Sequence, residues 1–248
     1  MDLGLSDHAY VVTAGSRGLG FATAQALAGE GARVLVASRD QAALDRACSA
    51  LGPDAASLAL DLAAPDAAER LLGCAVDTLG RIDGVLVNVG GPVPGRSLDY
   101  TDDQWQAAIE GVLMASVRLM RAFAPRIAQG GAMLAVLSTT VREPIEGLGA
   151  SNVLRPGLAM LVKELSIELA PTVRVNGILP GRIATDRMVA LTQGDADATH
   201  AVEASVPLGR LGDPAEFGRV AAFLLSPAAS YVTGAFVPVD GGILRAPW

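Results

Sequence analysis

The sequence predicts an α/β protein with a doubly wound parallel sheet of seven strands and helices on both faces. Short apolar runs alternate with helix-length amphipathic stretches along the chain, which is typical of successive βαβ units. The runs are nearly continuous in apolar residues, as expected of strands buried on both faces. No linker, repeat or low-complexity segment interrupts the 248 residues, so we expect residues 1–248 to form a single domain.

The individual elements follow from this pattern in chain order. The first strand is expected at Tyr10-Val11-Val12, because a glycine-rich turn follows it and then a helical pattern with Phe21, Ala24 and Leu27 on one face. Later strands are predicted at 33–37, 57–60, 82–87, 132–137, 173–178 and 236–239. Later helices are predicted at 41–51, 65–79, 102–129, 150–170 and 213–225. Residues 185–205 are less apolar, and we expect them to form a mobile flap.

Composition argues against several classes of function. The net charge of −7 disfavours nucleic acid as a partner, and the longest apolar runs are far too short to cross a bilayer. The N-terminus has no basic start and no apolar segment of signal-peptide type, so we expect no secretion signal. Cys48 and Cys74, the only cysteines, fit a reducing compartment and offer no metal-binding set. These features predict a cytoplasmic protein without a metal, a membrane or a nucleic-acid partner.

The turn after the first strand predicts a phosphate site. Its sequence is Thr13-Ala14-Gly15-Ser16-Arg17-Gly18-Leu19-Gly20. Three glycines without Cβ atoms let the backbone bend sharply and let a pyrophosphate come close. The helix N-terminus behind them adds partial positive charge and free N–H groups. Three glycines also occur in ordinary strand–helix turns that bind no ligand. The residues at the ends of the other strands are therefore needed to distinguish a phosphate site from an ordinary turn.

The next strand ends carry side chains suited to the rest of a dinucleotide, because ligands of doubly wound sheets lie beyond the carboxyl ends of the strands. Ser38 and Arg39 end the second strand, where an NAD site usually has an acidic residue. Arg39, together with Arg17, suits a 2′-phosphate through charge-assisted bonds, so NADP is predicted over NAD. The alternative is that Arg39 is a solvated surface residue. Candidates for the adenine and ribose are Asp61, Leu62, Asn88 and Gly90.

Taken together, these motifs resemble the classical short-chain dehydrogenases/reductases, and most closely the 3-oxoacyl-[acyl-carrier-protein] reductase branch. The turn at 13–20 is similar to the cofactor turn of that family with Ala14 and Gly15 exchanged. Asn88-Val89-Gly90-Gly91 is similar to its Asn-Asn-Ala-Gly motif, although Asn88 is also a plausible turn former. Further matches lie at 174–185, 209–216, 230–234 and 239–242.

The resemblance implies a Rossmann fold that binds NADP(H). The segment 174–185 is similar to the part of the family that holds the nicotinamide. By that similarity, Pro180 and Gly181 line the nicotinamide ring, while Ile183 and Thr185 bond its carboxamide.

The catalytic residues depart from the family, whose members use an Asn-Ser-Tyr-Lys set with the last two as Tyr-x-x-x-Lys. The resemblance places Ser138 at the serine, Ser151 at the tyrosine, Arg155 at the lysine and Val112 at the asparagine. The sole lysine, Lys163, lies eight residues past Arg155, about 12 Å along a helix. An arginine stays protonated at any working pH, so Arg155 can bind an anion or a ribose but cannot relay a proton.

Pro156 makes the start of the helix after the fifth strand ambiguous. Proline is tolerated in the first turn of a helix but disrupts its interior. Either the helix starts near Ala150, which places Ser151 and Arg155 in the family geometry, or it starts near Pro156, which leaves both residues on a loop.

Three functional hypotheses follow. The first is a divergent NADPH-dependent carbonyl reductase, in which Ser138 donates to the carbonyl oxygen, Ser151 or water supplies the proton and Arg155 stabilises the alkoxide. The second is a catalytically silent NADP-binding subunit that pairs with an active relative. The third is a different reaction on the same scaffold. The groups available to that third reaction are Arg142, Glu143, Glu146 and His200.

Two expectations concern partners. Arg155 with Arg142 suggests a small carbonyl substrate that is anionic or carried on the phosphopantetheine of an acyl carrier. The helical patterns 102–129 and 150–170 resemble the oligomer interface of the family, which implies a homo-oligomer, either a dimer or a homotetramer.

Overall fold

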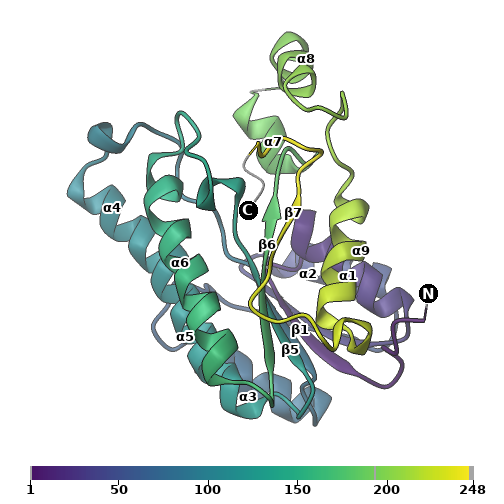
Figure 1. Ribbon diagram of the computed structural model, residues 1–248. Helices are drawn as coiled ribbons and strands as arrows, with labels where there is room; N and C mark the ends of the chain where they lie inside the picture. The colour runs from purple at the N-terminus through teal and green to yellow at the C-terminus, as the bar shows by residue number, and fades with distance from the viewer. Residues whose placement is uncertain (1, 193, 246–248) are drawn as a thin grey trace.

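A computed structural model describes residues 2–192 and 194–245. Their strands form one parallel sheet in the order β3-β2-β1-β4-β5-β6-β7 (Figure 1). The strands are β1 (Ala9–Thr13), β2 (Arg33–Ser38), β3 (Ala55–Ala59), β4 (Gly84–Val87), β5 (Ala132–Val136), β6 (Arg174–Pro180) and β7 (Phe236–Val239). The α-helices are α1 (Gly18–Gly29), α2 (Gln41–Leu51), α3 (Ala67–Leu79), α4 (Asp102–Ala108), α5 (Ala115–Phe123), α6 (Gly149–Glu168), α7 (Asp186–Leu191), α8 (Ala196–Ala204) and α9 (Pro214–Leu225). The predicted fold class is confirmed.

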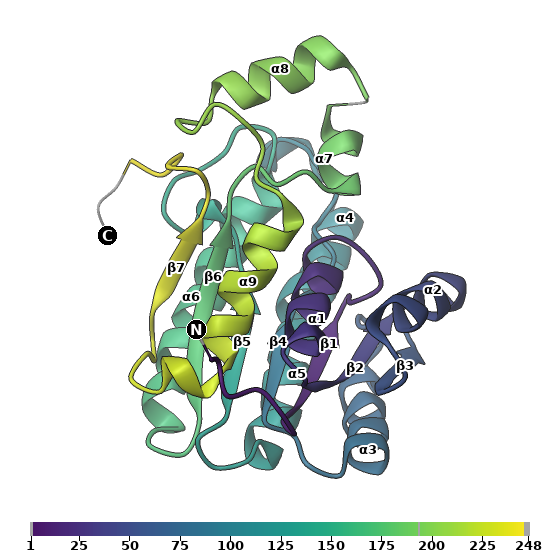
Figure 2. The ribbon, with the colours of Figure 1, turned by 90° about the vertical axis from the view of Figure 1, so that its right-hand side faces the viewer.

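Helices cover both faces of the sheet, and each face has its own apolar core (Figures 1 and 2). The core on one face includes Val11 and side chains of α3, α5 and α6. The opposite core includes Tyr10 and Val12 and side chains of α1 and α9. Because neighbouring residues of a strand point to opposite faces, both cores need apolar side chains, which explains the nearly continuous apolar runs of the sequence.

The chain changes direction between β1 and β4. From β1 it runs outward through β2 to β3, and then returns to place β4 on the other side of β1. The loops at the carboxyl ends of β1 and β4 therefore diverge and leave a crevice. This crevice is the expected location of a ligand.

The helix predicted at 102–129 differs from the structure in its continuity and in its end. The single helix expected at 102–129 is interrupted by a π-helical segment, Ile109–Met114, and α5 ends at Phe123. The end has a local reason, since Pro125 lies in the following 3₁₀ turn, Ala124–Arg126, and has no N–H to donate. The other elements with predicted bounds differ from prediction by at most two residues at either end, whereas α7 and α8 were not predicted as helices.

The start of α6 is at Gly149, so the alternative start near Pro156 was wrong. The side chain of Asn152 fixes the first turn to the preceding loop: its Oδ1 accepts the Ile145 N–H at 3.0 Å, and its Nδ2 donates to the Ile145 carbonyl at 2.9 Å. These two bonds hold the turn that Pro156 would otherwise leave weak. Ser151 and Arg155 therefore lie four residues apart on a helix, with their side chains on the same face.

The segment 185–205 forms α7 and α8 and stands away from the sheet (Figure 2). Residue 193, between these helices, lies outside the described residues. No residue of α8 is buried, and segments with few buried contacts open easily. The mobility of this flap stays a prediction. Among the described residues, no helix combines the length and the apolar character needed to cross a membrane.

Candidate active site

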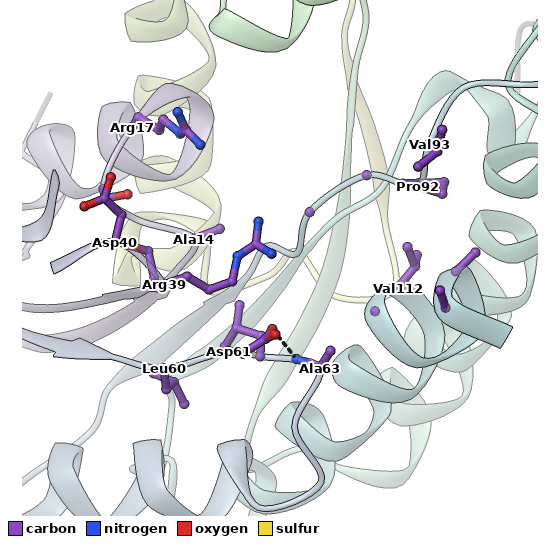
Figure 3. A pocket seen from close by; sticks show the side chains of 18 of the residues that line it. Ala14, Arg17, Arg39, Asp40, Leu60, Asp61, Ala63, Pro92, Val93 and Val112 are labelled. Atoms are coloured by element: carbon purple, nitrogen blue, oxygen red, sulfur yellow. Dashed lines mark hydrogen bonds between the residues drawn. The ribbon is translucent and has the colours of Figure 1, made fainter. Parts of the chain in front are cut away.

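Two clefts open at the carboxyl ends of the strands. The first, about 550 Å³, lies beyond β1, β2 and β3 (Figure 3). The second, about 560 Å³, lies beyond β4, β5 and β6 and is bounded by α6 and α7. Gly91 and Pro92, on the loop after β4, line both clefts. An elongated ligand that filled both clefts would pass these two residues.

The glycine turn has the geometry that a close backbone approach requires. A Cβ on Gly20 would lie 2.3 Å from the Ala14 carbonyl oxygen, and one on Gly15 would lie 2.8 Å from the Val12 carbonyl oxygen. Gly18 has a φ of +57°, which L side chains rarely adopt. Ala14 also has a positive φ, +47°, at the place where the sequence exchanges alanine and glycine relative to the family. An alanine therefore adopts a left-handed conformation here that glycine would adopt without strain.

The first cleft presents cations and an unpartnered hydroxyl at the end of β2. Arg39 is exposed and extends toward the centre of the cleft, and Arg17 lines the same side of it (Figure 3). The Ser38 Oγ is buried without a partner among the described residues. The nearby Asp40 caps α2 by accepting the Ala43 N–H at 3.1 Å. Buried polar groups are normally bonded, so the Ser38 hydroxyl and the two guanidinium groups fit a phosphorylated ribose.

Other residues predicted to bind the adenosine also line the first cleft. Asp61 and Leu62 line the first cleft with Gly90 and Ser16. Oδ1 of Asp61 accepts the Ala63 N–H at 3.1 Å, which holds the loop after β3 (Figure 3). This carboxylate keeps a second oxygen available for an amino group.

The second cleft contains the segment that the sequence assigns to the nicotinamide. Pro180, Gly181, Ile183 and Thr185 all line it, and Leu19 and Asn88 close its inner side. A Cβ on Gly181 would lie 2.6 Å from the Asp240 Cα, so only glycine lets the end of β6 pack this closely on the C-terminal segment. Asn88 is fixed by its backbone, because the Thr13 hydroxyl accepts its N–H at 2.8 Å.

Ser138, Ser151 and Arg155 line this same second cleft. The Ser138 Oγ accepts the Thr140 N–H at 3.1 Å, which orients the oxygen and leaves its own proton to donate. The Ser151 Oγ lies 3.5 Å from the Thr140 hydroxyl. Arg155 donates through Nη1 to the Val136 carbonyl. Burial, and then the positive charge of Arg187, lowers the Arg155 pKa to about 10, so the group remains a cation at neutral pH.

No tyrosine or lysine replaces the missing dyad in the part of the chain that the structure describes. Lys163 donates its Nζ to the Gly234 carbonyl at 3.2 Å. Tyr10 is in the core, where burial raises its pKa, and Tyr231 is fully exposed. Tyr100 lines the first cleft and donates to the Val93 carbonyl. The second cleft therefore has hydroxyls and guanidinium groups but no phenol or ammonium.

Some predicted residues do not converge on this site. Arg142 donates to the Phe236 carbonyl at 3.2 Å and does not line the second cleft, so the expected pairing of Arg142 with Arg155 was wrong. His200 is exposed on α8 and lines neither cleft. Glu143 and Glu146 do line the second cleft, and Glu143 accepts the Arg245 N–H at 3.1 Å.

Sequence reasoning missed Arg187, on α7. Its Nη2 donates to the Pro92 carbonyl at 3.2 Å, and its Cζ lies 2.5 Å from where a Cβ on Gly91 would be. The preceding residue, Asp186, lies 3.6 Å from Arg17, so the first turn of the flap contacts both sides of the crevice. The sequence did offer a signal for it, because Asp186 and Arg187 directly follow the segment 174–185 that was assigned to the nicotinamide.

A glycine turn after β1, a reversal of strand order between β1 and β4, and two clefts that meet at Gly91 and Pro92 define a dinucleotide-binding protein of the doubly wound class. The family model described as Enoyl-(Acyl carrier protein) reductase matches residues 13–244. Dehydrogenase/reductase SDR family member 4 of Oryctolagus cuniculus is 34% identical over 245 residues, which cover 96% of this chain and 94% of that protein. The chain belongs to the short-chain dehydrogenase/reductase family.

Two solved structures are also close in fold. L-sorbose reductase from Gluconobacter frateurii, in complex with NADPH and L-sorbose, has a TM-score of 0.93 and 29% identity, covering 99% of this chain and 100% of that one. A short-chain oxidoreductase from Pseudomonas aeruginosa PAO1, described as containing an atypical catalytic center, has a TM-score of 0.91 and 30% identity, covering 98% and 99%. The family binds nicotinamide cofactors and comprises oxidoreductases.

Proposed function

We propose that this chain is an NADPH-dependent carbonyl reductase in which Ser138, Ser151 and Arg155 act at the site that a tyrosine and a lysine usually occupy. The observation that carries the proposal is that these three residues share one cleft with Pro180 and Thr185, the segment expected to hold the nicotinamide. The NADPH complex of the related sorbose reductase supports the choice of cofactor. The relative with an atypical catalytic center supports a departure from the usual residues.

The residues present fit the cofactor. Arg39, Arg17 and the unpartnered Ser38 hydroxyl would hold the 2′-phosphate. The glycine turn would receive the pyrophosphate on backbone N–H groups. The nicotinamide would lie along the second cleft beside Pro180. When bound, NADPH supplies the hydride for the carbonyl carbon.

The chain itself has to polarise the carbonyl and deliver a proton to its oxygen. Ser138 donates its O–H to that oxygen, since the bond that its Oγ accepts from the Thr140 N–H orients the hydroxyl and leaves its proton available. Arg155 stabilises the negative charge that develops there, as preorganised donors do in a dry site. Arg155 cannot supply the proton at neutral pH, since its pKa is about 10. The proton therefore comes from water, with Ser151 as a relay.

The variant Ser138→Ala tests this assignment. We expect kcat for NADPH oxidation by a carbonyl substrate to fall about 10²-fold, the typical loss for one oxyanion donor, with the NADPH Kd changed less than about twofold. Ser166→Ala is the matched control, because this buried serine on α6 bonds only the Lys163 carbonyl. Unchanged kcat in Ser138→Ala, or tight NADPH binding without turnover of any carbonyl compound, would contradict the proposal. The second result would favour the silent subunit.

We also propose that the chain forms a homo-oligomer through α6. Val153, Met160 and Ile167 are spaced by seven residues and are 57%, 70% and 70% exposed, so they form one apolar stripe on the outer side of this helix. Apolar stripes of this kind on a stable protein mark contact surfaces. A second copy of the chain, paired through the same stripe, would cover it in a dimer or tetramer.

A further inference from the structure

We propose that the substrate is a small 2-oxo or 3-oxo acid whose carboxylate is bound between Arg155 and Arg187. The inference rests on the proposed carbonyl reduction, because it names the class of compound reduced in the same cleft. It goes further by assigning Arg187, and by requiring an anion next to the reacting carbonyl. Three observations carry it: a buried guanidinium that makes a single hydrogen bond, a second guanidinium that lines the same cleft, and the position of Arg155 relative to the serines.

Arg155 is buried without a full set of partners. Its side chain is 6% exposed, it makes one bond, to the Val136 carbonyl, and its Nε has no partner. Arg174, which is 8% exposed, also has an Nε without a partner, but its two Nη atoms donate to four backbone carbonyls, those of Leu224, Leu225, Ser226 and Val232. A buried charge is costly unless it is paired. Arg155 therefore has donor capacity in the cleft for a ligand.

Arg187 adds a second positive charge at the mouth of the same cleft. Both side chains line this cleft, and after burial the positive charge of Arg187 is the second cause of the lowered pKa of Arg155. Among the described residues, no carboxylate lies within 4.0 Å of either group. Glu143 and Glu146 line the cleft as well, and Glu143 accepts the Arg245 N–H at 3.1 Å. An anion between the two guanidinium groups would relieve their repulsion.

The position of Arg155 sets the distance between that anion and the carbonyl. Ser151 and Arg155 are one turn apart on α6, and Nη1 of Arg155 donates to the carbonyl of Val136, two residues before Ser138, which is a span of about 7 Å in an extended chain. A carboxylate on Arg155 therefore places an atom one or two bonds away near Ser151 and Ser138. That spacing selects 2-oxo and 3-oxo acids. It does not suit compounds in which a long chain separates the anion from the carbonyl.

The test uses oxamate and malonate, which are unreactive mimics of the two acid classes, titrated by calorimetry with and without NADP⁺. We expect at least one of them to bind the wild type. We expect Arg155→Met and Arg187→Met each to raise its Kd about 10- to 100-fold, as for a lost charge-assisted hydrogen bond. Arg126→Met, which removes an exposed arginine on the 3₁₀ turn after α5, is the control and should change the Kd less than about threefold. Circular dichroism checks folding, and Arg187→Met tests the inference even if Arg155→Met does not fold.

NADPH titrations of the same variants separate this inference from the proposed function. If NADPH binds and neither acid does, the carboxylate site is wrong and the reductase proposal survives. If Arg187→Met weakens NADPH more than tenfold and leaves acid binding unchanged, Arg187 belongs to the cofactor and the inference is overturned. If NADPH fails to bind, the proposed function fails, while the titrations without nucleotide still report on the carboxylate site. Faster reduction of a 2-oxo or 3-oxo acid than of its methyl ester, by at least about tenfold, is the expected kinetic counterpart.

Discussion

The double variant Ser151→Tyr with Arg155→Lys is expected to reduce neutral ketones about 10²-fold faster than the wild type, which is the usual contribution of general acid catalysis. The physical reason is the start of α6 at Gly149, which keeps positions 151 and 155 one turn apart on the side that lines the second cleft. A phenol at 151 with an ammonium at 155 would have a lowered pKa and would deliver the proton that water now supplies. Steady-state NADPH oxidation with a panel of ketones measures the gain.

The two single variants, Ser151→Tyr and Arg155→Lys, are the controls for this prediction. Ser151→Tyr alone has no cation of the right kind beside it, and Arg155→Lys alone has no phenol, so each should gain less than about fivefold; residues that act as a unit are strongly non-additive. The double variant should also lose preference for acids over their esters, because lysine lacks the fork of the guanidinium group. A folded double variant without any gain would show that the nicotinamide does not lie beside position 151.

The variant Arg39→Asp should reverse the choice of nucleotide. Arg39 extends into the first cleft next to the unpartnered Ser38 hydroxyl (Figure 3), where it would bind a 2′-phosphate. Replacing it by a carboxylate removes a charge-assisted bond and adds repulsion, so we expect the NADPH Kd to rise about 10²-fold. The NADH Kd should fall, because a carboxylate at this place accepts the ribose 2′-hydroxyl. Fluorescence titration with both reduced nucleotides measures the change.

A charge-matched control is Arg70→Asp. Arg70 is exposed on α3, 3.6 Å from Asp66, and lines neither cleft. It should change neither Kd more than about threefold. Equal affinity of the wild type for NADPH and NADH, or an unchanged preference in Arg39→Asp, would mean that Arg39 is the solvated surface residue of the alternative interpretation.

The features that could be predicted from the sequence are those fixed by local chemistry. The turn with Gly15, Gly18 and Gly20 needs small residues within a few positions of one another, so its composition alone indicates its shape. Ser38 and Arg39 could be placed because a strand end follows directly from an apolar run. Ser138 was placed by the family resemblance, at the end of the fifth apolar run.

The features that could not be predicted depend on contacts between residues far apart in the sequence, or on which of two competing local preferences prevails. Pro156 argued locally for a late helix start, but the bonds between Asn152 and Ile145 outweigh that preference. Arg142 and Arg155 looked equivalent in sequence, yet one is bonded to a β7 carbonyl and the other lines the cleft. Arg187 contacts Pro92, 95 residues away. The spacing of apolar residues along the sequence carries no information about a contact between residues so far apart.

The most direct test of the central claim is a crystal structure of the chain with NADP⁺ bound. The account predicts the 2′-phosphate on Arg39, the nicotinamide ring against Pro180, and Ser138, Ser151 and Arg155 around its C4 atom, with no tyrosine or lysine beside them. Clefts that stay empty in crystals grown with millimolar NADP⁺ would contradict the cofactor assignment. A phenol or an ammonium next to Ser138 in that complex would contradict the proposed replacement of the dyad.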